Sequence, residues 1–227
     1  MLGHPYSHSE APTAMTDLPE DVVESMRKTP RQARAWATCR TIFAATLQLL
    51  DRGGEQGLTT NRVAERAGFS VGTLYQYFPN MEAVLAAMID LERRRVLAGL
   101  DRLLSRAETE QAHPLDVLRE VVAYLLANFG LGGGARRILL RRAWRHDHLP
   151  PVVALVQAGA ARIRLFIARR AHPAFPVPDE AALFAATRAV LGTIRAAVLE
   201  DSPLLGRPEF EEMLVRLALG PLTAGPR

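Results

Sequence analysis

Apolar residues recur along most of this 227-residue chain at steps of three and four, the spacing of one face of a helix. The first such stretch follows Thr29-Pro30, a capping residue and a first-turn proline, and stops at the glycines of 51–54. Its apolar face consists of Trp36, Cys39, Phe43, Leu47 and Leu50. No segment alternates polar and β-branched residues between turn signals, as a half-buried strand would. The pattern predicts an all-α chain.

We predict nine helices, separated by glycine and proline. Their approximate ranges are 30–50, 60–67, 71–77, 81–106, 115–129, 135–147, 151–171, 179–200 and 208–219. Prolines stand at or just before the start of four of the last five, where a missing backbone N–H is tolerated. Gly220-Pro221 is expected to end the last helix.

The most informative segment is residues 58–78, LTTNRVAERAGFSVGTLYQYF. Gly68 is expected to end a first short helix in the left-handed region, and Ser70 to cap a second one. Leu74 and Phe78 are four residues apart, so both are expected to face the core of the same domain. Two short helices joined by a tight, glycine-containing turn form a helix-turn-helix, whose second helix enters the DNA major groove.

The outward face of this unit is the predicted DNA-binding site. Its candidate residues are Thr60, Asn61, Arg62, Ser70, Val71, Gly72, Thr73, Tyr75, Gln76 and Tyr77. Gly72 allows close approach of the backbone, Gln76 can bond a base edge, and the hydroxyl groups suit phosphate oxygens. The alternative interpretation is that Tyr75 and Tyr77 merely cover the core at the rim of the domain.

The same segment resembles the DNA-binding domain of the TetR family of regulators, whose pattern is close to T-x-x-x-[IV]-A-x-x-A-G-[VF]-S-x-G-x-[LF]-Y-x-[HY]-F. The matching residues are Thr59 or Thr60, Val63, Ala64, Ala67, Gly68, Ser70, Gly72, Leu74, Tyr75, Tyr77 and Phe78. The resemblance spans about residues 31–90, and the nine-helix architecture with a long fourth helix also agrees. It implies a regulator, usually a repressor, that leaves double-stranded operator DNA when a small-molecule effector binds, and that forms a homodimer through its last two helices.

One residue departs from the family pattern. Met81 stands where the family usually has a lysine that touches a phosphate, so one charge-assisted contact is lost. Asn80 can still cap the helix that follows, leaving its first N–H groups available to a phosphate. A helical interaction protein that has kept this fold and lost DNA binding therefore stays open as an alternative.

We accordingly predict four parts: a disordered leader over 1–28, a helix-turn-helix domain over 29–80, a linking helix over 81–106, and a ligand-binding and dimerisation domain over 107–227. Large apolar side chains at helical spacing are the candidate ligand contacts in the last part, although most such residues are core. They are Tyr124, Phe129, Trp144, Phe166 and Phe184. The helix over 179–200 is apolar on more than one side, as expected of a helix between its own bundle and a dimer partner.

Charge refines this picture. The net charge is +4, yet residues 1–26 carry only acidic charges, whereas residues 27–80 carry eight bases and three acids. The leader could compete with DNA phosphates, but a solvated segment is the simpler interpretation. Arg137, Arg141 and Arg145 form a stripe that is either an anion-binding wall or, more simply, a solvated helix face.

Several classes of protein are excluded or disfavoured. A single cysteine rules out intrachain disulfides, and neither a secretory leader nor an uncharged spanning helix is visible, so we expect a cytoplasmic protein without membrane contact. We expect no enzyme activity and no cofactor, because no phosphate loop or catalytic set is present. His146 and His148 precede a proline and are predicted to lie in a capping loop, not a metal site.

Overall fold

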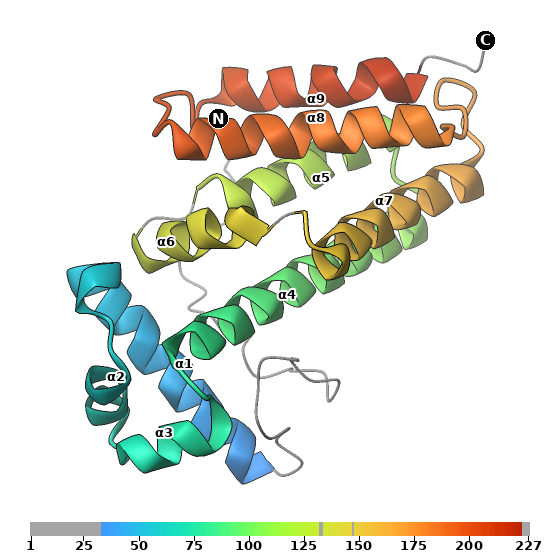
Figure 1. Ribbon diagram of the computed structural model, residues 1–227. Coiled ribbons are helices and arrows are strands. Elements are labelled where there is room, and N and C mark those ends of the chain that lie inside the picture. Colours follow the sequence, from blue (N-terminus) through green and yellow to red (C-terminus); the bar gives the residue numbers. More distant parts are fainter. Residues whose placement is uncertain (1–32, 132–133, 147, 224–227) are drawn as a thin grey trace. The chain divides into compact units, whose positions relative to one another are not determined.

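The computed structural model describes residues 33–131, 134–146 and 148–223 (Figure 1). Over these residues the chain forms nine α-helices and two short 3-10 turns, without a strand. The predicted all-α class and the predicted number of helices are therefore confirmed for the described chain. It divides into two compact units between Leu91 and Glu92, a boundary that falls inside one long helix.

Unit 1 contains three helices and the first turns of a fourth. These are α1 (Ala33–Gly53), α2 (Thr60–Ala67), α3 (Val71–Tyr77) and the start of α4 (Met81–Thr109), with a 3-10 turn at Glu55–Gly57. α1 packs on α2, and α2 packs on α3. The residues with no exposed surface in this core are Cys39, Ile42, Phe43, Thr46, Val63, Leu74, Phe78, Val84 and Ala87.

The predicted face of α1 is confirmed in its centre and is broader than predicted. Cys39, Phe43 and Leu50 are buried, whereas Trp36 and Leu47 at its edges are half-buried. Ile42 and Thr46, which the stripe of large apolar residues omitted, are also fully buried. Thr46 is tolerated there because its hydroxyl donates to the Ile42 carbonyl at 2.8 Å. The predicted cap at Thr29 lies outside the described residues.

Unit 2 is a bundle built from the rest of α4 and five further helices. These are α5 (Pro114–Phe129), α6 (Gly134–Ala143), α7 (Pro150–Arg170), α8 (Glu180–Leu199) and α9 (Pro208–Thr223), with a 3-10 turn at Trp144–His146. α9 runs back along α8, and both pack on α5 (Figure 1). Buried side chains form two adjacent clusters, one around Leu100, Val117 and Phe166 and the other around Val122, Ile194 and Leu214.

Two helix ends differ from the prediction. α9 continues through Gly220-Pro221 to Thr223, so the predicted stop was wrong. A proline lacks an N–H and crowds the preceding turn, but Leu222 is buried in the first cluster, which favours one more helical turn. The α-helix predicted over 135–147 ends at Ala143 and tightens into a 3-10 turn.

Two helices, α7 and α8, are long and apolar enough to cross a membrane if length and composition are the only criteria. In the structure each of them packs one face against the core of unit 2. α8 buries Leu183, Val190 and Ile194 within the bundle, and α7 buries Phe166 and Ile167. Helices that cover a protein core satisfy the same length and composition test.

Candidate nucleic-acid interface and ligand pocket

Three local features shape the segment from α2 to α3. The Thr59 hydroxyl accepts a hydrogen bond from the Arg62 N–H, and the Ser70 hydroxyl accepts one from the Thr73 N–H, so both helices have side-chain caps. Gly68 ends α2 with φ 72° and ψ 27°, where a side chain would be strained. The Phe69 N–H then bonds the Ala64 carbonyl at 2.9 Å, which closes the turn between the helices.

α3 is anchored through one face only. Leu74 and Phe78 have no exposed surface, and the Phe78 ring packs on Phe43 of α1 with centroids 5.6 Å apart. The predicted inward orientation of these two residues is confirmed. On the other side Gly72, Tyr75 and Gln76 are exposed, while Val71, Thr73 and Tyr77 are half-buried. α3 therefore presents a polar, uncharged surface to solvent.

Hydroxyl groups lie close together across the two helices. The Tyr75 hydroxyl on α3 is 3.4 Å from the Thr60 hydroxyl on α2, so both oxygens reach one small area of surface. The Ser70 and Thr73 hydroxyls are 2.9 Å apart, which ties the polar end of Thr73 to the cap. An area with two neighbouring hydroxyl donors suits a single phosphate oxygen.

The basic side chains of α2 are partly engaged within unit 1. Arg62 donates to the Gly57 carbonyl at 2.7 Å, and Arg66 donates to the Gln48 amide oxygen at 2.6 Å. Each guanidinium has further N–H groups, so these contacts orient the charges and leave donors for a phosphate. Asn61 is exposed in the first turn of α2.

The N-terminus of α4 agrees with the expectation for Asn80. Its side-chain oxygen accepts a hydrogen bond from the Ala83 N–H at 2.9 Å, so Asn80 caps the helix. Met81, which stands in the place of the family lysine, is half-buried. The capped N-terminus of α4 is therefore present, and only the positive charge of the family lysine is missing at position 81.

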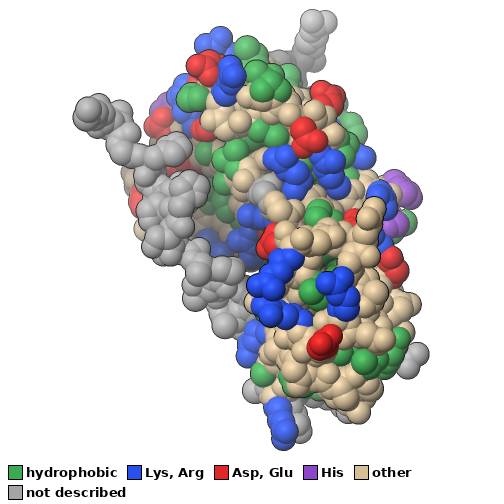
Figure 2. Space-filling model, turned by 90° about the vertical axis from the view of Figure 1, so that its left-hand side faces the viewer, with side chains coloured by type: hydrophobic (Ala, Val, Ile, Leu, Met, Phe, Trp, Pro, Cys, Tyr) green, Lys and Arg blue, Asp and Glu red, His purple; other side chains and the backbone are tan. Residues whose placement is uncertain are grey.

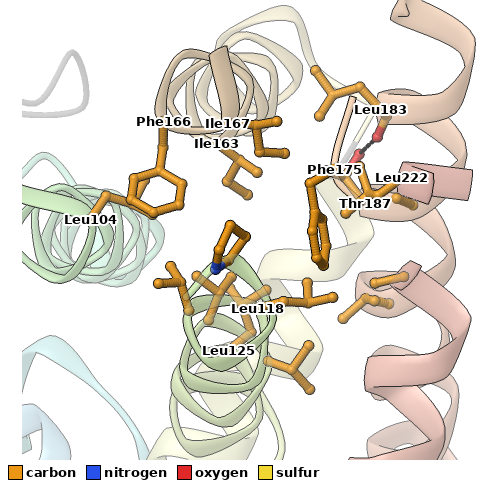
Figure 3. Close-up of a pocket in the computed structure, with 17 residues that line it drawn as sticks. Leu104, Leu118, Leu125, Ile163, Phe166, Ile167, Phe175, Leu183, Thr187 and Leu222 are labelled. Atoms are coloured by element: carbon orange, nitrogen blue, oxygen red, sulfur yellow. Dashed lines mark hydrogen bonds between the residues drawn. The ribbon is translucent and has the colours of Figure 1, made fainter. Parts of the chain in front are cut away.

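Unit 2 contains a pocket between α4, α5, α7, α8 and α9 (Figure 3). About 640 Å³ of space lies between the lining atoms, part of it open to solvent. Ile163 and Phe166 of α7, Leu118 of α5 and Phe175 of the α7–α8 loop surround its centre. Its walls are almost entirely hydrocarbon.

Of the five predicted pocket residues, Phe166 lines this pocket and the other four lie elsewhere. The Tyr124 hydroxyl donates to the Val96 carbonyl at 2.9 Å, which fastens α5 to α4. Phe129 and Trp144 pack against the second hydrophobic cluster. Phe184 is 61% exposed on α8, with the Arg188 guanidinium 5.5 Å from its ring centroid.

A polar network that the sequence did not indicate joins α4, α5 and α6. Glu92 accepts hydrogen bonds from Arg95 and Arg136, and both arginines also donate to the buried Asn128 amide oxygen. Burial alone would raise the pKa of Glu92, but the hydrogen bond from Arg95 and the charges of both arginines outweigh it and lower the pKa. Arg95 lies three residues from Glu92 on the same helix, but Arg136 is 44 residues away, and the sequence gives no signal of that pairing.

Two of the three arginines of the predicted stripe, both on α6, form ion pairs. Arg137 and Arg141 both contact the Asp201 carboxylate at 2.8 Å, and Arg141 also donates to the Val198 carbonyl at the end of α8. The hydrogen bond from Arg141, with the charges of the two arginines, lowers the pKa of Asp201. Figure 2 shows arginines in separate groups with acidic side chains nearby. This pairing favours a structural role over an anion-binding wall.

The histidines beyond α6 lie at the surface. His146 and His148 are both exposed, and Asp147 between them lies outside the described residues. Among the residues that the structure describes, no group of three or more histidine, cysteine or acidic side chains could hold a metal ion.

Comparison with known proteins gives matches of two kinds. Residues 42–88 match the family model described as "Bacterial regulatory proteins, tetR family". The HTH-type transcriptional repressor KstR of Mycolicibacterium smegmatis is 40% identical over 63 residues, covering 28% of this chain and 31% of that protein. The matches to KstR proteins span about a third of those relatives' length.

Solved structures resemble a larger part of the chain. The fatty acid degradation regulator FadR from Bacillus halodurans has a TM-score of 0.56 at 19% identity, covering 84% of this chain and 96% of its own. FadR from Bacillus subtilis, solved in complex with stearoyl-CoA, has a TM-score of 0.55 at 17% identity, covering 83% and 99%. At these identities the likeness establishes the fold, with both the helix-turn-helix and the helical bundle.

Proposed function

We propose that this chain is a transcriptional repressor of the TetR type, which binds operator DNA and is released by a small-molecule effector; the match of residues 42–88 to the TetR family model supports this. The burial of Leu74 and Phe78 is the observation that carries this proposal. It holds α3 so that Tyr75 and Gln76 face outward, where they can meet the major groove.

The chemistry of the exposed face suits some of its side chains to contacts with bases and others to contacts with phosphates. Gln76 offers an amide that can pair with an adenine edge, and the methyl groups of Val71 and Thr73 can touch thymine methyls. The neighbouring hydroxyls of Thr60 and Tyr75 can bind a phosphate. Other predicted contacts are made by Asn61, Arg62, Ser70, Gly72 and Tyr77.

A homodimer is part of the proposal. α8 and α9 leave apolar side chains exposed, among them Phe184, Met213 and Leu217 at 61, 57 and 40%. These faces suit a four-helix contact with the same helices of a second copy, and the association would set two α3 helices about 34–36 Å apart on DNA. Such a protein acts on DNA in the cytoplasm.

Release of DNA requires that the effector prefer a conformation in which the two α3 helices are wrongly spaced. A coupling of about 1–3 kcal/mol is typical of such systems. The pocket of unit 2 is the proposed effector site, and the ligand held by the Bacillus subtilis neighbour supports a ligand-binding role for a bundle of this fold.

Fluorescence anisotropy with DNA fragments from upstream of its own gene tests the proposal. We expect tight binding that weakens as salt rises. Replacing Tyr75 with alanine should weaken binding at least about fivefold, because a phosphate contact and the ring are lost, and should leave the dimer intact. Leu165→Ala, an exposed position on α7, is the matched control. Unchanged affinity of Tyr75→Ala would show that the proposed docking is wrong.

One observation keeps a second function in view. Met81 removes the family's cationic contact at the start of α4, as in a protein that has kept the fold and now binds another protein. An absent or salt-insensitive anisotropy signal on every upstream fragment would favour that function. The intact Asn80 cap favours the repressor.

A further inference from the structure

The pocket in unit 2 carries an inference about the chemical class of its ligand, which rests on the proposed effector-binding function. Of the side chains that line it, all are hydrocarbon except Thr187. The Thr187 hydroxyl lies 2.8 Å from the Leu183 carbonyl oxygen and 3.1 Å from that of Phe184, so its proton is already used within α8 (Figure 3). The walls therefore offer a ligand no hydrogen-bond donor.

A polar group placed in such a pocket would lose its hydration without replacement, which is strongly unfavourable. A charged group would be worse, because no lining side chain carries an opposite charge. Hydrocarbon, in contrast, gains from leaving water at every methylene. The part of the ligand inside the pocket is consequently apolar along its whole length.

Polar groups do lie beside one part of the wall. Phe175, which lines the pocket, packs against His113 and His172, with ring centroids 6.4 and 6.1 Å away, and the two imidazoles are 4.8 Å apart. His113 is exposed and directly precedes Pro114, another lining residue. This part of the wall therefore reaches the protein surface.

The hydrogen bonds of the two imidazoles determine which ring nitrogen of each can donate to a ligand. Nδ1 of His113 accepts from the Leu115 N–H, and Nδ1 of His172 accepts from the Ala174 N–H, both at 3.2 Å. A nitrogen that accepts carries no proton, so the ring proton of each residue is on Nε2. Two neighbouring Nε2–H donors thus stand where the wall meets solvent.

We propose that the effector is a slender amphipathic molecule of the class of a medium-chain alkanoic acid. Its hydrocarbon body fills the pocket, and its single hydrogen-bond-accepting end stays at the surface beside His113 and His172. A molecule that is polar at both ends is excluded, because one end would be buried among hydrocarbon walls.

Isothermal titration calorimetry on the DNA-free protein tests this with a matched pair of probes, decanoic acid and decanedioic acid. We expect decanoic acid to bind, and affinity to rise roughly three- to fourfold for each methylene added from hexanoic to decanoic acid. Decanedioic acid, which has the same chain and a second carboxylate, should bind at least a hundredfold more weakly. Equal binding of the two acids, or affinity that is independent of chain length, would overturn the proposal.

Three variants and one control test where the ligand binds. Ala186→Leu, which adds volume to the pocket wall, should weaken decanoic acid at least tenfold, whereas Ala168→Leu on the exposed side of α7 should not. Thr187→Val keeps the shape and removes the hydroxyl, so affinity should change less than twofold; a large loss would mean that the ligand needs a polar contact inside. His172→Ala should weaken binding about fivefold and leave the chain-length dependence unchanged.

The outcome is separable from that of the proposed function. Binding of decanoic acid to a protein that binds no DNA would leave this inference standing and refute the repressor. Tight binding to an upstream DNA fragment without binding of any alkanoic acid would refute this inference alone.

Discussion

If α3 lies in the major groove as proposed, its individual side chains set which DNA sequences the protein can read. α3 carries no charged residue, so it lacks the arginine that most often reads guanine. Gln76 is its exposed amide, and glutamine pairs best with adenine. The Thr73 hydroxyl is tied to Ser70, which leaves the methyl group of Thr73 as its free end. These residues favour an operator with A·T pairs where α3 enters the groove.

Met81 offers a gain-of-function test at the residue scale. Met81→Lys restores a cation beside the α4 N-terminus, so we expect tighter DNA binding at low salt. The slope of log affinity against log salt should become steeper by about 0.9, the value for one more phosphate contact. Anisotropy titrations across a salt series measure both. Leu165→Lys, which places the same cation at an exposed position on α7, serves as the control. An equal slope in the Met81 variant and the wild type would place position 81 away from the DNA.

At the scale of elements, the sequence predicted helix positions well because helix ends are local. The caps at Thr59, Ser70 and Asn80 are chemical signals that act over three residues. The end of α9 was missed because burial of Leu222, a tertiary effect, outweighs Pro221.

The pocket was predicted poorly for a different reason. Large aromatic residues were chosen as ligand contacts, but large side chains fill space, and only Phe166 of the five lines the cavity. The cavity is bounded mostly by medium-sized aliphatic residues such as Val117, Val121 and Leu125, whose spacing cannot be distinguished from that of ordinary core.

The hydrogen-bonded network around Glu92 joins α4, α5 and α6, and its contribution to stability can be measured because it depends on pH. The pKa of Glu92 lies below the ordinary value, so its stabilising effect is present above about pH 4.5 and is lost as pH falls through the lowered value. Glu92→Gln should therefore be less stable than wild type at neutral pH, and the gap should shrink toward pH 3. Urea denaturation at several pH values measures this, with the exposed Glu65→Gln as control. A gap that stays constant with pH would contradict the assigned pairing.

At the scale of the whole molecule, the proposed function requires that two copies associate before they bind an operator. α8 and α9 expose several large apolar side chains, among them Phe184, Met213 and Leu217, which a monomer would leave in water. α8 and α9 also pack closely along each other in unit 2, so their outer faces lie side by side (Figure 1).

Phe184→Glu tests this surface. A carboxylate in the centre of an apolar interface is costly, so we expect monomers in sedimentation velocity and operator affinity reduced at least tenfold. Leu165→Glu places the same charge at another exposed apolar side chain, on α7, and should remain dimeric. If Phe184→Glu stays dimeric with full affinity, the copies associate through another surface.

Site-specific crosslinking tests the central claim, that the exposed face of α3 lies in the DNA groove. The single cysteine, Cys39, has no exposed surface, and burial raises its pKa to about 12, so it should not react with thiol reagents. A photoactivatable group attached to Gln76→Cys should then crosslink to bases in both operator half-sites. The same group on Gln157→Cys of α7 should not. Operator binding without a crosslink from position 76, or with equal crosslinks from both positions, would contradict the account.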